Sequence, residues 1–107
     1  MRSHEWIDQR SLALDRLIAD KLERRPDLLQ VAHQNLERWI TESRGRPLRA
    51  HLEWRDLLAR TPLPELLRLL RSETEEARRL RQSSPFAGLL SPEERWRILR
   101  EYETRAA

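Results

Sequence analysis

Three histidines are the first residues to consider for acid–base or metal chemistry, because imidazole titrates near neutral pH and is a common zinc ligand. His4, His33 and His51 stand far apart in the sequence. His33 has Glu37 one helical turn later and His51 has Glu53 close by, but zinc sites usually show closer ligand pairs such as His-x-x-x-His. We therefore expect histidines at the surface, and neither a catalytic nor a metal site.

Other catalytic residues are equally hard to find. The chain has no cysteine, which excludes disulfides, thiolate metal ligands and cysteine nucleophiles. Its only glycines, Gly45 and Gly88, are too far apart for a glycine-rich phosphate loop. The glutamates within residues 73–76 and 93–94 fall in the first turns of expected helices, where they complement the helix dipole. The sequence thus predicts a protein that is not an enzyme and that binds no cofactor.

Arginine is the residue most able to bind an anionic partner, since Lys21 is the only lysine among 21 basic residues. Arginines grip phosphates with bidentate geometry. The net charge is only +3, however, and acidic residues are interleaved with the arginines, unlike the concentrated basic stripe of a nucleic-acid-binding domain. A nucleic-acid-binding regulator is therefore our second hypothesis. Its contacts would be Arg44, Arg46, Arg49, Arg78, Arg79 and Arg81.

These side chains must be positioned by helices, because glycine and β-branched residues are scarce. Apolar residues recur at steps of three and four, as on one face of a helix. We predict an all-α, single-domain bundle over residues 1–107, with about five to six helices and an N-terminal helical hairpin formed by the first two. The expected helices cover residues 5–24, 26–43, 47–59, 63–71, 73–82 and 92–104.

The boundaries of these helices are marked by familiar end signals. Pro26 suits the first turn of the second helix, and Gly45 can adopt the left-handed conformation that ends it. Ser-x-x-Glu sequences at residues 72–75 and 91–94 both predict a capping box, in which the serine and the glutamate bond each other's backbone amides.

Large apolar side chains are more numerous than a thin helical domain of this size easily hides. The four tryptophans, Trp6, Trp39, Trp54 and Trp96, are spread over the expected helices, and a loop near residues 83–91 carries further apolar residues. Most tryptophans at periodic apolar positions belong to the core, and Phe86 could also close it. Surplus apolar surface, in contrast, marks a partner site or self-association. The predicted partner contacts are Pro85, Phe86, Leu89, Leu90 and Trp96.

One stretch of the chain also carries a family resemblance. Residues 80–96 (LRQSSPFAGLLSPEERW), together with residues 3–7 (SHEWI), resemble a group of small uncharacterised bacterial helical proteins. Such proteins are often paired with a nucleotidyltransferase-type or other toxin, so the resemblance implies an antitoxin-type neutraliser with a protein partner. Antitoxins that mimic nucleic acid are acidic and this chain is not, so blockade would use apolar and arginine contacts.

Our leading hypothesis from sequence is thus a non-catalytic protein-binding module, with a self-associating structural protein as a third alternative. The N-terminus has no apolar signal-peptide core, and no uncharged run approaches the roughly 18 residues that a membrane span needs. We therefore expect a cytoplasmic protein with no membrane partner.

Overall fold

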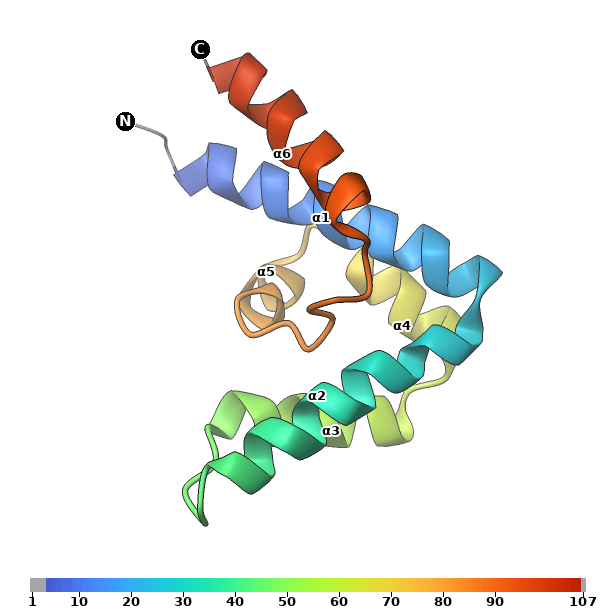
Figure 1. The fold of residues 1–107 in the computed structure, drawn as a ribbon, viewed down its shortest axis with the longest axis vertical. Coiled ribbons are helices and arrows are strands. Elements are labelled where there is room, and N and C mark those ends of the chain that lie inside the picture. Colours follow the sequence, from blue (N-terminus) through green and yellow to red (C-terminus); the bar gives the residue numbers. More distant parts are fainter. Residues whose placement is uncertain (1–3, 107) are drawn as a thin grey trace.

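The computed structural model describes residues 4–106, and within them the regular structure is entirely helical (Figure 1). The described residues form one body with extents of 43 × 31 × 27 Å. The prediction of a small all-α bundle is therefore confirmed. The elements are α1 (His4–Arg24), a 3₁₀ turn η1 (Pro26–Leu28), α2 (Leu29–Glu42), α3 (Arg49–Arg60), α4 (Leu63–Leu70), α5 (Glu75–Arg81) and α6 (Pro92–Ala106).

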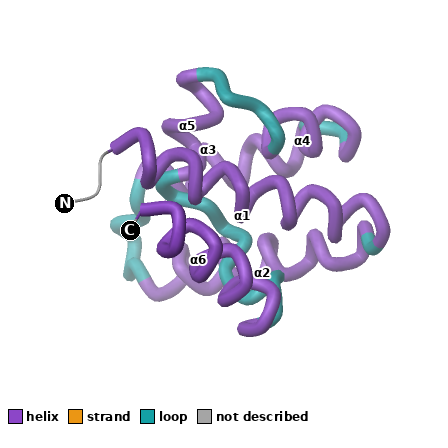
Figure 2. The backbone as a smooth tube through the Cα atoms, turned by 90° about the horizontal axis from the view of Figure 1, so that it is seen from above, coloured by secondary structure: helices purple, strands orange, loops and turns teal. Residues whose placement is uncertain are grey.

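The long helix α1 is the element around which the others assemble. It packs against α4, α5 and α6, and seen from above it runs across the middle of the molecule (Figure 2). Its buried residues Leu12, Ile18, Ala19 and Leu22 recur at helical spacing and so share one face. Asp15 interrupts this apolar face and is buried with it.

The hairpin of this fold is formed by α2 and α3, and not, as the sequence suggested, by α1 and α2. Between the first two helices the chain leaves helical geometry at Arg25 and turns through η1, so α1 and α2 diverge as an open V (Figure 1). Beyond α2 the left-handed residues Arg44 and Gly45 turn the chain back, and α3 packs along α2. Proline at residue 26 removes a backbone donor, which explains why α1 does not simply continue.

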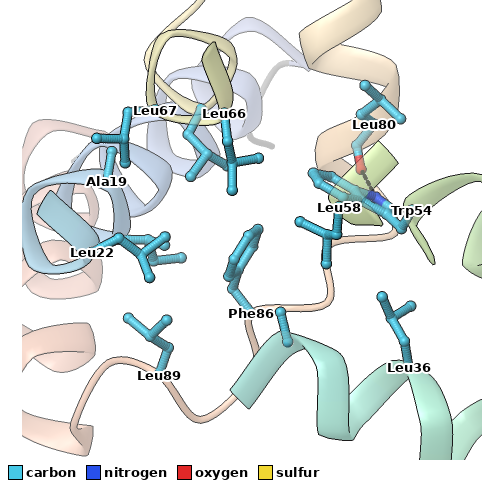
Figure 3. Close-up of a cluster of buried hydrophobic side chains, with 13 residues drawn as sticks. Ala19, Leu22, Leu36, Trp54, Leu58, Leu66, Leu67, Leu80, Phe86 and Leu89 are labelled. Carbon is cyan, nitrogen blue, oxygen red and sulfur yellow. Dashed lines mark hydrogen bonds between the residues drawn. The ribbon is translucent and has the colours of Figure 1, made fainter. Parts of the chain in front are cut away.

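The core lies where these elements meet, and Phe86 from the loop between α5 and α6 occupies its middle (Figure 3). The ring of Trp54 on α3 meets the Phe86 ring edge to face, with centroids 5.7 Å apart. The indole Nε1 of Trp54 donates to the Leu80 carbonyl oxygen at 3.0 Å, so the buried polar atom of this tryptophan is satisfied. Leucines from α1, α2, α3, α4 and α5 complete the cluster.

Only one of the two expected capping boxes forms. At the start of α6 the Ser91 amide donates to Glu94 Oε1 at 2.8 Å, and the Glu94 amide donates to Ser91 Oγ at 3.1 Å. At the start of α5 the cap is instead Thr74, whose Oγ1 accepts from the Ala77 amide. The helix expected from residue 47 begins at Arg49, because Leu48 is extended.

Candidate protein-binding surface

The loop predicted to contact a partner is mostly inside the protein. Phe86 and Leu89 are only 2% and 4% exposed, and Pro85 is among the most deeply buried side chains. Leu90 is partly buried against the same core. These residues fill the space enclosed by the leucines of the surrounding helices (Figure 3), so the prediction that the loop offers them to a partner is wrong.

Polar side chains hold this loop in place from two sides. Asn35 on α2 donates through Nδ2 to the carbonyl oxygens of Pro85 and Ala87, at 2.9 and 2.8 Å. On α1, Lys21 donates through Nζ to the Leu89 carbonyl at 3.0 Å and to Glu94 Oε1 at 2.6 Å. We did not single out either residue from the sequence, although the uniqueness of Lys21 among the basic residues was a usable signal.

Trp96 is the one predicted contact that lies on the surface, with 59% of the residue exposed. It shares the outer face of α6 with residues at helical spacing. Glu93, Arg97 and Arg100 on this face make no ion pair with any residue that the structure describes. The exposed tryptophan thus lies beside three charged side chains, Glu93, Arg97 and Arg100, that have no ion-pair partner among the described residues. The spacing of these residues from Trp96 could have been read from the sequence.

The position of α6 explains why this face points to solvent. The helix packs alongside α1, and the Trp6 indole Nε1 donates to the Tyr102 carbonyl oxygen at 2.9 Å. Ile98 and Leu99 on the same helix are partly buried. The capping box and Lys21 fix its first turn, so the tryptophan is carried by a well-anchored helix.

The three arginines of α5 are occupied by carboxylates. Arg79 makes a bidentate pair with Glu53, with N–O distances of 2.8 and 2.9 Å, and Arg78 lies 3.3 Å from Asp8. Arg81 is buried, so it is not available to a phosphate backbone. This corrects the hypothesis that Arg78, Arg79 and Arg81 form a free basic patch.

Arg81 instead forms a buried ion pair with Asp15. Its Nε lies 3.0 Å from Asp15 Oδ2, and the two side chains are 6% and 8% exposed. Its Nη2 also donates to the Ser72 carbonyl oxygen at 2.7 Å. Burial raises the pKa of Asp15 to about 6, although the guanidinium of Arg81 acts in the opposite direction. The pair borders a cavity of about 220 Å³ beside the loop, and no histidine lines that cavity to act as a base.

The arginines at the turn between α2 and α3 have a different environment. Arg44, Arg46 and Arg49 are exposed, and none forms an ion pair within the described chain. Leu48 beside them is 63% exposed. Of the predicted arginine set, only this half is free to meet an anion.

The histidines are not brought together. The His51 ring stacks on Trp39 with centroids 4.9 Å apart, and His4 and His33 are exposed on α1 and α2. Within residues 4–106 no group of three or more histidine, aspartate or glutamate side chains could hold a metal ion.

Comparisons with known proteins add no family. Neither a protein-family model, nor a curated protein, nor a solved structure matches this chain. Among the residues that the structure describes, no helix combines the length and the apolar character needed to cross a membrane.

Proposed function

We propose that this chain is a cytoplasmic, non-catalytic protein-binding module, and that its partner docks on the outer face of α6. The observation that carries the proposal is the exposure of Trp96, because tryptophan side chains are on average highly buried in folded proteins. Tryptophan and arginine are the residue types most enriched among those that dominate binding energy at interfaces. Here Trp96 lies on one helix face with Arg97 and Arg100.

The way α6 is anchored supports the same function. A binding face loses less conformational entropy on association when its helix is already ordered. The Lys21–Glu94 pair and the capping box order the first turn of α6. Glu94, which takes part in both, stands two residues before Trp96. In the antitoxin-type role that the family resemblance implies, the partner on this face would be a toxin enzyme, which would exclude any other occupant of the face.

A site-specific photo-crosslinker tests this proposal. Benzoylphenylalanine at position 96 keeps an aromatic side chain on the face, and the same group at position 59, on the exposed Ala59 of α3, is the matched control. We expect a defined protein adduct from position 96 in living cells and none of the same mass from position 59. Equal adducts from both positions, or none from position 96, would contradict the proposal.

Nucleic-acid binding is a second candidate, supported by the unpaired arginines at the turn between α2 and α3. Three phosphate contacts predict a salt dependence with a slope of about −3 in a plot of log K against log salt concentration. We expect the variant Arg44→Glu, Arg46→Glu to abolish any such binding, with Arg78→Glu as the control outside this turn. Duplex DNA that fails to bind even at low ionic strength would remove this candidate.

A further inference from the structure

We propose that the occupant of the α6 face is a second copy of this chain, with the two α6 helices packed antiparallel across a two-fold axis beside Trp96. The proposal builds on α6 as the docking face and names its partner. It is drawn from the order of Glu93, Trp96 and Arg100 along that face, which Arg97 and Glu101 also line.

This order is self-complementary in an antiparallel pair. A two-fold axis between residues 96 and 97 sets position 93 of one copy opposite position 100 of the other. Glu93 then pairs with Arg100 of the second copy, and symmetry repeats this pair at the other end. Each of these residues is about 5 Å along the helix from the axis, at a rise of 1.5 Å per residue. Trp96 lies next to the axis, opposite Arg97 of the second copy and close to its own copy.

Parallel packing of two copies of the same face would instead place like charges opposite each other. It sets Glu93 against its own copy and Arg100 against its own copy, so like charges oppose each other at both levels. An antiparallel pair shifted so that the axis passes through Arg97 sets the two copies of that arginine directly opposite each other, and it sets Glu93 opposite Glu101 of the second copy. The charges of the face thus favour one arrangement over its neighbours, as charge patterns do in helical pairing.

The pairing also gives partners to two charges that have none among the described residues. Arg71, Arg78, Arg79 and Arg81 have carboxylate partners, whereas Arg44, Arg46 and Arg49 are, like Arg100, exposed and without an ion pair to any described residue. Glu93 and Arg100 have none within the described residues, although they flank a large exposed ring. The second copy supplies a partner for each charge and covers the tryptophan in one step.

The size of the contact sets the expected strength. One helix face per copy buries roughly 1,000 Å² in total, at the low end of specific interfaces. We therefore expect a dissociation constant on the order of 10 µM, since small interfaces have little surplus over the cost of association.

Charge exchange across the two-fold axis tests the proposal. We expect the purified wild-type chain to sediment as a monomer–dimer equilibrium, and Glu93→Arg or Arg100→Glu alone to weaken the dimer at least tenfold. Each single variant repels itself at two places. Mixing the two single variants should restore a heterodimer, because every position 93 then faces an opposite charge at position 100. The double variant Glu93→Arg, Arg100→Glu should dimerise again.

The controls separate association from folding. Both side chains are exposed, so each variant should keep the helical circular dichroism of the wild type, and Arg68→Glu on α4 should leave the dimer unchanged. A wild-type chain that stays monomeric at 200 µM, or a mixture of variants that stays monomeric, overturns the self-pairing. If position 96 then crosslinks a different protein in cells, the docking face stands and only its occupant is wrong. If it crosslinks nothing, both proposals fall.

Discussion

The shape of the Lys21 side chain, unlike that of arginine, suits the two contacts that it makes. Its compact ammonium group reaches a backbone carbonyl and a carboxylate at the same time, Leu89 O and Glu94 Oε1. A planar guanidinium has a different shape and spreads its donors over a wider fork. Lys21 therefore links α1 to both the end of the loop and the start of α6.

Replacing this lysine tests the link. We expect Lys21→Met to lower the free energy of unfolding by about 1–2 kcal/mol, since a part-buried charged hydrogen-bond donor is lost. Arg24→Met, on an exposed residue of the same helix, should change it by less than about 0.5 kcal/mol. Urea unfolding of both variants measures the difference. An equal effect of the two would show that Lys21 does not anchor the loop.

Two carboxyl groups, those of Glu94 and Asp15, make the free energy of unfolding depend on pH in opposite directions. Hydrogen bonds from Lys21 and from the Ser91 amide lower the pKa of Glu94 to about 2, against 4.5 for a free glutamate. Its contribution is therefore present above pH 4.5 and is lost as the pH falls toward 2. Burial raises the pKa of Asp15 from 3.8 to about 6. The folded state therefore holds the proton of this carboxyl group more tightly than the unfolded state does, and the contribution of Asp15 to stability falls as the pH rises from 4 to 6.

Single amide substitutions should separate the two effects. Glu94→Gln should flatten the loss of stability between pH 4.5 and 2. Asp15→Asn should remove the decline between pH 4 and 6, which is worth about 1–3 kcal/mol. Urea unfolding from pH 2 to 7 measures both. A variant Asp15→Asn that keeps the decline would assign it to another group.

At the level of single residues, the sequence predicted what was apolar but not which way it faced. Phe86 and Trp96 are both large and both lie near the C-terminal end, and we assigned both to a partner. Phe86 is in the core and Trp96 is at the surface. The difference depends on whether other elements surround the residue, which the local pattern does not contain. The polar clamp from Asn35 was missed for the same reason, since its acceptors are 50 and 52 residues away.

At the level of elements, the helices themselves were predictable because they depend on local signals. Their periodicity and end signals lie within a few residues, and most expected boundaries agree with the structure to within two residues. The exception is the second helix, which was expected from residue 26, whereas residues 26–28 form the 3₁₀ turn η1 and α2 begins at Leu29. The capping box of α5 failed because two hydroxyls compete there. Thr74 stands two residues after Ser72 and just before Glu75, so it becomes the cap of α5. Ser72 Oγ accepts from the amide of Thr74 and not from a helix amide.

Alanine substitutions can rank how much each of these hydroxyl side chains contributes to the stability of the protein. Ser91→Ala should destabilise the protein by about 1 kcal/mol, and Thr74→Ala by a similar amount, because each removes an acceptor from a helix amide. Ser72→Ala should cost less, since its hydroxyl caps no helix. Thermal unfolding followed by circular dichroism compares the three variants. A larger loss at Ser72 than at Thr74 would mean that the sequence-predicted box forms in solution.

At the level of the whole molecule, the pairing of helices was the part that the sequence left open. The apolar faces of α1, α2 and α3 are all lined by leucine, alanine or tryptophan, so periodicity alone does not choose between α1–α2 and α2–α3 pairs. The choice is made by the turns. The 3₁₀ turn η1 opens the first connection, and the left-handed residues near Gly45 close the second.

Alanine substitutions of Phe86 and Trp96, which stand on either side of the α6 cap, should show which of the two belongs to the core. We expect Phe86→Ala to cost about 3–5 kcal/mol, because it leaves a cavity where α1, α2, α3 and α4 meet. Trp96→Ala should change the free energy of unfolding by less than about 0.5 kcal/mol for the monomer. Chemical denaturation at low protein concentration, where association is absent, makes the comparison. A strong loss from Trp96→Ala would place this residue in the fold rather than in binding.

The central position of Phe86 also constrains how the chain can acquire its structure. The contacts that fix the loop join residues far apart in the chain: Asn35 with Pro85, Lys21 with Leu89 and with Glu94, and Asp15 with Arg81. Closing such long loops is entropically costly and slows folding. During synthesis, the first five helices emerge from the ribosome before the residue that fills the space between them. We expect the helices before Phe86 to stay loosely packed until Phe86 and the residues that follow it have emerged.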